Sequence, residues 1–306
     1  MEQNTATTAR TEAGIVPRER SDRPIDAGVD IGHVHLKAAD LDRIRAFYVD
    51  ILGFDVVFHM PTALFIAAGG YHHTLGFNTW ESRGGTPPPP GTTGLYHVAI
   101  RYPTRAALGD ALRRLSAAGW PIDGFNDHGT HEAIYLPDAD GNGIELAADR
   151  PRERWPQGLG YSGGPAPLDF DSLLTTVQGE ESRAQVDEGL RMGHLHLHVG
   201  DIDEALAFYR DVLGFEEQAN LGTAAFVSAG GYHHHLGLNV WKGRGVGPAP
   251  EHAVGLRHWT VELPTAADVA EVRARLEAAG VPVLDRPGGL LVRDPWGTAL
   301  VFEAAG

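Results

Sequence analysis

The chain repeats itself at a constant spacing of 161 residues, as from His33 to His194. The segment IGHVHLKAADLDRIRAFYVDILGFDV (31–56) matches MGHLHLHVGDIDEALAFYRDVLGFEE (192–217). The same spacing relates AGGYHHTLGFNTW (68–80) to AGGYHHHLGLNVW (229–241), and GLYHVAI (94–100) to GLRHWTV (255–261). One spacing held over three separate blocks indicates a duplicated structural unit, and 306 residues leave room for about two domains.

Towards the end of each half the spacing changes. Tyr135 corresponds to Leu291 and Gly141 to Gly297, 156 residues apart, so five residues are missing from the second copy. They are lost from the segment FNDHGTHEAIY (125–135). The second half therefore has no counterpart of His128 and His131.

Each half contains two copies of one pattern of secondary structure. GHVHLKA alternates as a strand does, Asp40 is a predicted helix N-cap, LDRIRAFYVDIL has helical spacing, and three short β-rich runs follow. The pattern repeats with the strand GLYHVAIRY, a helix over Thr104–Ala118 ended by Gly119, and three runs that finish at IELAA. The prediction is four βαβββ modules of the α+β class, with PPPP (87–90) joining the first two.

Two segments are predicted to lie outside the repeated domains. Residues 1–28 are polar and lack the apolar stretch of a signal peptide, which predicts a flexible tail. Residues 151–190 are rich in Pro, Gly and charge and are predicted to form a connector, with a short helix near 171–177. The expected domains are then 29–150 and 191–306. No run reaches the roughly 18 apolar residues of a membrane helix, which favours a cytoplasmic protein.

Composition restricts the chemistry. With 25 basic and 40 acidic residues the formal charge is −15, which argues against nucleic acid or an anionic membrane as a partner. The absence of cysteine excludes disulfides, thiolate metal sites and a cysteine nucleophile. Any metal must therefore bind to the chain through histidine with Asp or Glu, and 16 histidines are present.

The segment HVHLKAADLDRIRAFYVDILGF resembles the opening motif of the vicinal-oxygen-chelate superfamily, which includes glyoxalase I, fosfomycin and bleomycin resistance proteins, and extradiol dioxygenases. The resemblance covers about residues 30–150 and 191–303. It implies two tandem domains whose curled mixed sheets each enclose a divalent metal. Ligands would come from the first strand of one module and from the first and last strands of the other.

Carried over to this sequence, the resemblance assigns the metal to His33, His97 and Glu145 of the first half. Two imidazoles and one carboxylate are the ligand set of non-haem iron(II) oxygenases. The matching positions of the second half are His194, His258 and Val301. Because valine cannot bind a metal, the second site is predicted to be degenerate and its domain structural, with Glu303 as a reserve ligand.

A further resemblance is to the extradiol ring-cleavage motif, as found in two-domain catechol 2,3-dioxygenases. It is carried by Asn126-Asp127-His128, Ile134-Tyr135, Asp138, Gly141 and Glu145, and it departs at Ala139, where proline is expected. The block AGGYHHTLGF resembles the strand that carries a catalytic histidine in those enzymes. That role is assigned to His73, with His72 as the alternative because neighbouring strand residues face opposite ways.

The activity implied by these resemblances is insertion of O₂ into catechol or a substituted catechol beside the diol, at a mononuclear Fe(II) or, alternatively, Mn(II). His73 would act as base and then as acid, since a neutral imidazole suits both proton transfers. Tyr135 would hydrogen-bond a diol oxygen or the forming ketone, and His128 would assist at the mouth of the site. The partners would be a catecholic substrate and O₂, and the chain could form a homo-oligomer, since sheets of the superfamily often pair between chains.

Two other classes of function stay open at this point. One is a different metal-dependent enzyme of the superfamily, such as a lyase, an isomerase or a thiol transferase. The other is a non-enzymatic protein that sequesters an aromatic drug, although such a binder needs no metal. The run His233–His235 is interpreted as an inherited strand that has drifted, and His35 and His196 as bonding to backbone or to a neighbouring domain.

Overall fold

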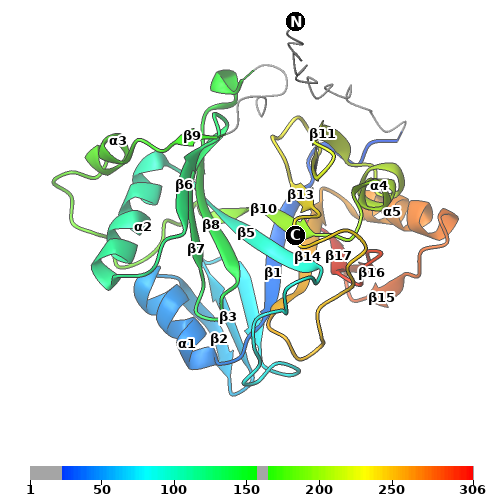
Figure 1. Ribbon diagram of the computed structural model, residues 1–306, viewed down its shortest axis with the longest axis horizontal. Helices are drawn as coiled ribbons and strands as arrows, with labels where there is room; N and C mark the ends of the chain where they lie inside the picture. Colours follow the sequence, from blue (N-terminus) through cyan, green and yellow to red (C-terminus); the bar gives the residue numbers. More distant parts are fainter. Residues whose placement is uncertain (1–22, 157–164, 306) are drawn as a thin grey trace, which may run out of the picture.

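A computed structural model describes residues 23–156 and 165–305. It contains the four predicted βαβββ modules (Figure 1). The first is β1 (Asp30–Lys37), α1 (Leu41–Arg45), β2 (Asp55–Met60), β3 (Ala63–Ala67) and β4 (Leu75–Asn78). The second is β5 (Gly94–Tyr102), α2 (Arg105–Ala118), β6 (Gly124–Asp127), β7 (His131–Pro137) and β8 (Gly143–Asp149).

The second half repeats this order. The third module is β10 (Arg191–His198), α4 (Ile202–Leu206), β11 (Glu216–Asn220), β12 (Ala224–Ser228) and β13 (Leu236–Asn239). The fourth is β14 (Gly255–Leu263), α5 (Ala266–Ala278), β15 (Leu284–Arg286), β16 (Gly289–Arg293) and β17 (Ala299–Ala304). Between the halves lie β9 (Ala166–Pro167) and α3 (Phe170–Thr175), a helix close to the predicted one. The predicted α+β class is confirmed.

The predicted helix boundaries have the expected chemical causes. The Asp40 side chain accepts hydrogen bonds from the backbone of Asp42 and Arg43, and the helix then continues as a wider π-helical segment, Ala46–Ile51. Thr104 caps α2 in the same way, and Gly119 ends it with φ +62°. A left-handed residue at a helix C-terminus satisfies the last carbonyl groups, and glycine adopts that conformation without steric cost.

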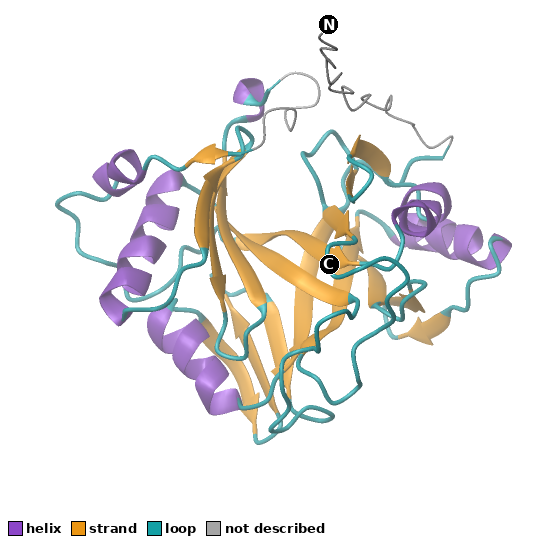
Figure 2. Ribbon diagram, in the orientation of Figure 1, coloured by secondary structure: helices purple, strands orange, loops and turns teal. Residues whose placement is uncertain are grey.

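The sheets join modules from opposite halves of the chain. One sheet has the order β15-β16-β17-β14-β1-β4-β3-β2, and the other β11-β12-β13-β10-β5-β8-β7-β6-β9. The first module therefore shares a sheet with the fourth, and the second with the third. This corrects the expectation that residues 29–150 enclose a metal site by themselves. The two sheets lie inside the molecule, and helices cover their outer faces (Figure 2).

The links between modules help to explain why each sheet combines modules from both halves of the chain. The proline run 87–90 favours an extended chain, which carries the polypeptide from one sheet to the other. The corresponding link of the second half runs beside it, because Thr93 donates its backbone N–H to Gly247 and Val254 donates to Thr86. Both links thus cross between the sheets at the same place.

The helix side of the core still holds each half together. Tyr48 follows α1 and donates a hydrogen bond to Asp138, beyond β7, while Tyr209 donates to Asp294 in the second half. Both tyrosines are completely buried. The repeated Phe-Tyr pair of the sequence is therefore a packing feature, and each half forms one unit on its helix side although its strands belong to two sheets.

Residues 23–28, which belong to the predicted tail, pack against the folded part of the chain. Ile25 is 3% exposed and donates its backbone N–H to Gly214, and Val186 makes the equivalent bond to Gly53. The predicted tail of 1–28 is thus wrong for residues 23–28, while residues 1–22 lie outside the described part of the chain. The repeat extends to these segments, since PIDAGV (24–29) matches QVDEGL (185–190) at the same spacing. Across the described residues, every helix falls short of the length and apolar character that crossing a membrane requires.

Candidate metal centre and active site

Three potential metal ligands meet on adjacent strands in the middle of the nine-stranded sheet. His196 of β10 lies opposite His97 of β5, so His194, two residues earlier, shares the face of His97. Glu145 of β8 lies beside Ala99, two residues beyond His97, and shares that face as well. The His97 and His194 Nε2 atoms are 3.0 Å and 3.1 Å from Glu145 Oε2, and 3.2 Å from each other.

This donor set fits a divalent metal. Donor atoms at right angles around one ion, each about 2.1 Å away, are roughly 3.0 Å apart, which is the spacing seen here. Burial lowers the pKa of His194, so its imidazole is neutral and able to bind. Burial alone would raise the pKa of Glu145, but His194 and hydrogen bonds from His131, His194 and His97 hold it well below its usual range. The group is therefore two buried imidazoles and an ionised carboxylate.

The structure does not bring His33 to this group, which corrects the predicted ligand set. His33 lies on β1 in the other sheet, where its Nε2 is 2.9 Å from Thr260 Oγ1. His194 takes its place, because β10 rather than β1 pairs with β5. The two strands carry the same G-H-x-H-L pattern, so the sequence contained both candidates and only the sheet pairing selects between them.

The equivalent position in the other sheet lacks a complete ligand set. His258 of β14 and Val301 of β17 correspond to His97 and Glu145. Glu303, the predicted reserve ligand, lies with Oε1 3.7 Å from His33 Nδ1. The degenerate site thus joins β1 with β14 and β17, and the complete one joins β10 with β5 and β8.

A cavity of about 510 Å³ opens onto the complete site. Two predicted catalytic residues line it together with His97 and Glu145, and His128 Nε2 and the Tyr135 hydroxyl are 2.8 Å apart. Burial lowers the pKa of His128 to about 4, which keeps its imidazole neutral at neutral pH. The rest of the lining includes the apolar side chains Leu136, Ile144, Pro165, Leu221, Ala224, Phe226 and Trp241.

His73, the predicted acid–base residue, lies elsewhere. Its Nε2 is 2.9 Å from His35 Nε2 in the eight-stranded sheet, and the alternative, His72, is exposed beside it. This assignment is corrected for the same reason as that of His33. The counterpart His234 lines the cavity, and its ring centroid is 4.0 Å from that of His194.

The run His233–His235 is therefore more than a drifted strand. His234 reaches the cavity, while His233 pairs with Asp149 at 3.2 Å and His235 with Ser228 at 2.9 Å. The sequence did indicate His234 as a candidate, since AGGYHH occurs at equivalent positions in both halves. Deciding which copy is used required the pairing of the sheets.

Sequence reasoning missed His131, which is almost fully buried beside the carboxylate. Its Nε2 is 3.0 Å from Glu145 Oε1, and its Nδ1 is 2.8 Å from Thr130 Oγ1. Because an ionised carboxylate only accepts hydrogen bonds, it is the Nε2–H of His131 that donates to Glu145. The ring is stacked between those of His128 and His233, with centroids 4.5 Å and 4.6 Å away. Its only sequence signal was its place in the segment that the second half lacks.

Comparison with known proteins adds independent findings. The family model described as Glyoxalase/Bleomycin resistance protein/Dioxygenase superfamily matches residues 30–146 and 191–302. A catechol-2,3-dioxygenase of Bacillus subtilis (strain 168) is 40% identical over 269 residues, which are 87% of this chain and 93% of that protein. Biphenyl-2,3-diol 1,2-dioxygenase 3 of Rhodococcus globerulus is 30% identical over 119 residues, covering 39% of this chain and 63% of that protein.

The fold is shared more widely than these relatives. The solved structure of glyoxalase I from Zea mays superposes with a TM-score of 0.56 at 16% sequence identity, over 90% of this chain and 92% of that one. This likeness concerns the fold alone. Because one fold hosts several chemistries, the reaction must be argued from the side chains in the cavity.

Buried histidines predict an acid-sensitive fold. Burial lowers the pKa of His233 and of His235 to about 3. The unfolded chain therefore binds more protons than the folded one below about pH 6.5, and each such histidine removes about 1.4 kcal/mol of stability per pH unit there. We expect the melting temperature of the metal-free protein to fall steadily from pH 7 to pH 5. His235→Gln should flatten this slope, and a melting temperature unchanged over that range would contradict the expectation.

His131 is expected to strengthen metal binding through Glu145. Partners that orient a ligand typically contribute 10- to 100-fold in metal affinity. His131→Ala should therefore weaken Fe(II) binding at the His97–Glu145–His194 site by that factor, measured anaerobically by competition with a chelator. His59→Ala, which removes an exposed histidine of β2, is the matched control and should bind as the unaltered protein does. Equal affinities for the two variants would show that His131 has no such role.

Proposed function

Because the chain belongs to the Glyoxalase/Bleomycin resistance protein/Dioxygenase superfamily, we propose that it is an extradiol dioxygenase that cleaves catechol or a substituted catechol beside the diol. The observation that carries the proposal is one cavity holding His97, His194 and Glu145 together with the His128–Tyr135 pair and His234. The catechol-2,3-dioxygenase relative, similar over nearly its whole length, supports the same reaction class. Such a reaction would serve the breakdown of aromatic compounds.

The metal we assign to the site is iron(II), with manganese(II) as the alternative that the same ligands accept. His97, His194 and Glu145 would hold it. When bound, it would supply the electron transfer that ground-state O₂ requires, and its remaining coordination positions would gather the two substrates. All three ligands are buried, which shields the site from bulk water.

The apolar wall of the cavity suits a flat aromatic ring. Phe226, Trp241, Leu136 and Ile144 are among its lining residues. These side chains would exclude water from the reacting face of a bound substrate, and the diol would then point at the metal ligands. No Lys or Arg occurs among the described lining residues, which suits an uncharged catechol.

Tyr135 and His128 would act as a pair on the substrate oxygens. The neutral imidazole of His128 can accept a hydrogen bond from the Tyr135 hydroxyl. The hydroxyl oxygen is then free to accept a hydrogen bond from the diol. Alternatively, the hydroxyl turns and donates to an oxygen that gains charge. Because Tyr135 lies opposite Glu145 in the β7–β8 pairing, its hydroxyl is held on the metal side of the cavity.

His234 would carry protons in place of His73. Burial lowers the pKa of His234 well below its usual value, so the ring is neutral and can accept a diol proton. It could return that proton as the O–O bond breaks, once the negative charge that forms beside it raises its pKa. His233 Nδ1 lies 2.9 Å from His234 Nδ1 and holds the other side of the ring.

Ring cleavage can be measured directly. Protein purified anaerobically, loaded with Fe(II) and mixed with catechol in air should consume O₂ and form a yellow product. Glu145→Ala and His194→Ala should lose at least 10³-fold in activity, because removal of a ligand empties the metal site. The matched variants Val301→Ala and His258→Ala should keep most of it. Absence of O₂ uptake from iron-loaded protein with any simple catechol would refute ring cleavage and leave a lyase, an isomerase, a thiol transferase or a drug-binding role.

The acid–base assignment has its own matched pair. His234→Gln should lower kcat by about 10²- to 10⁴-fold, the usual contribution of a positioned proton carrier. His73→Gln changes the equivalent residue of the other sheet and should leave kcat within twofold. Steady-state rates with catechol, together with measured iron content, distinguish the two variants. Equal losses in both would overturn the assignment.

A further inference from the structure

Five histidines cluster on the inner face of the eight-stranded sheet, away from the site described above. They are His33 and His35 of β1, His72 and His73 before β4, and His258 of β14. Ring centroids of His33 and His73 are 4.3 Å apart, and those of His72 and His73 are 4.6 Å apart. His33 and His258 stand at the ligand positions of the degenerate site, but the proposed reaction uses none of the five histidines.

His33 is oriented as a metal-binding histidine would be. Its Nε2 is 2.9 Å from Thr260 Oγ1, whereas its buried Nδ1 has no hydrogen-bond partner among the described residues. With Nε2–H donating to Thr260, the Nδ1 atom carries a free lone pair. Metal-ligating histidines almost always donate their other ring N–H to an oxygen in this manner.

A carboxylate stands on the open side of this lone pair. Glu303 Oε1 is 3.7 Å from His33 Nδ1. Glu303 is two residues beyond Val301, so it lies on the same strand face but one pleat further along than Glu145 does in the other sheet. Any metal of this cluster would therefore be displaced towards His72 and His73.

The charges around Glu303 favour a bound cation. Glu262 lies directly beside it in the β14–β17 pairing, and like charges at such positions repel each other. Burial and then Glu262 raise the pKa of Glu303, while His72 and Arg286 lower it. A cation bound beside Glu303 would relieve this repulsion.

We propose that His33, His72 and His73, with Glu303 as the oxygen ligand, form a second metal site that differs from the first in its ligands. One nitrogen of each of the three histidines lies within 4.8 Å of the others, a spread that a bound ion could draw together. Three imidazoles and one carboxylate favour a four-coordinate zinc-class ion, such as Zn²⁺ or Co²⁺. The site would tie β1 and the segment before β4 to β17, and so join the first module to the fourth.

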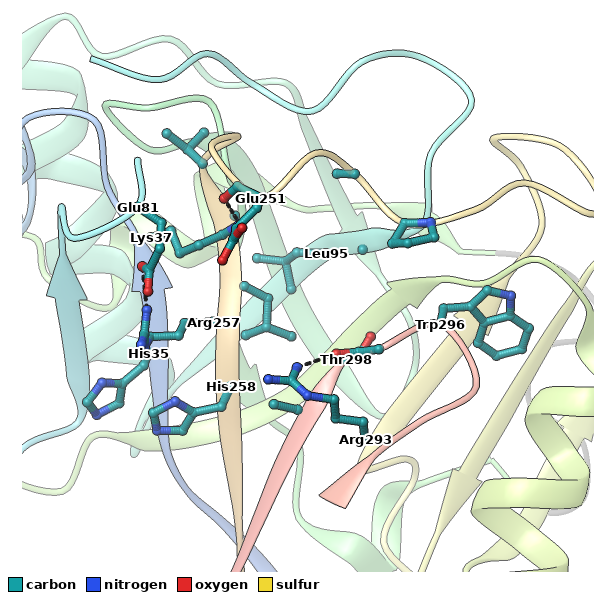
Figure 3. Close-up of a pocket in the computed structure, with 18 of the residues that line it drawn as sticks. His35, Lys37, Glu81, Leu95, Glu251, Arg257, His258, Arg293, Trp296 and Thr298 are labelled. Atoms are coloured by element: carbon teal, nitrogen blue, oxygen red, sulfur yellow. Dashed lines mark hydrogen bonds and ion pairs between the residues drawn. The ribbon is translucent and has the colours of Figure 1, made fainter. Parts of the chain in front are cut away.

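The neighbouring cavity supports a structural rather than a catalytic role for this ion. A cavity of about 680 Å³ borders the cluster, and Figure 3 shows His35 and His258 side by side at its edge. Their rings are stacked, with centroids 4.2 Å apart. His33, His72 and His73 are absent from the described lining of the cavity, whereas both stacked rings belong to it. Substrate entering the cavity would meet the stacked rings first.

Cobalt titration tests the second site without reference to catalysis. Chelator-treated protein is titrated with Co²⁺ under argon and followed by visible absorption, with bound metal counted after equilibrium dialysis. We expect two equivalents per chain, one of them with the intense absorption of four-coordinate Co²⁺. His194→Ala should lose the other equivalent and keep the intense band.

His72→Ala is the informative variant, because this side chain is exposed and its loss should leave the fold intact. It should weaken the intense-band equivalent at least tenfold, and Glu303→Gln should do the same. His59→Ala removes another exposed histidine and should change neither equivalent. A single equivalent in the unaltered protein, or an intense band that survives in His72→Ala, would overturn the proposal, while O₂ uptake with catechol tests the reaction at the other site separately.

Discussion

Everything distinctive about the active site depends on the antiparallel pairing of β5 with β10, and of β14 with β1 in the other sheet. This pairing places His97 and His194 on one face at the centre of a sheet, with β8 on the far side of β5 supplying Glu145. The backbone ladder sets which side chains are neighbours before any side-chain chemistry acts. Had β5 paired with β1, the same residue types would have come from one half of the chain.

The buried Glu145 carboxylate is the electrostatic centre of the site. A buried charge is tolerated only when it is paired and hydrogen-bonded, and here three imidazoles converge on its two oxygens. The other sheet lacks this arrangement, because Val301 stands at the position of the carboxylate and the segment with His131 has no counterpart. The carboxylate of that sheet, Glu303, lies two residues further along the strand than the position equivalent to Glu145. The histidine cluster there consequently has a different geometry.

Much of the fold was predictable because it rests on local signals. Asp40 and Thr104 identified helix starts, and the repeat identified four modules before any contact was known. The sequence correctly grouped four residues of the second module, namely His97, His128, Tyr135 and Glu145. Within one module, positions along the chain determine which side chains become neighbours in the sheet. His33 and His73 were assigned from another module, and there the prediction failed.

The sequence by itself determined the module, the repeat and the chemical type of the site, since each follows from nearby residues and their periodicity. It also contained His194 and His234, at the same repeat positions as His33 and His73. Only the tertiary structure decided between these equivalent pairs. The reason is physical, because equivalent strands of the two halves present the same side-chain pattern to a neighbouring strand. Which strands pair therefore depends on how the whole chain crosses between the sheets, and local sequence does not determine that path.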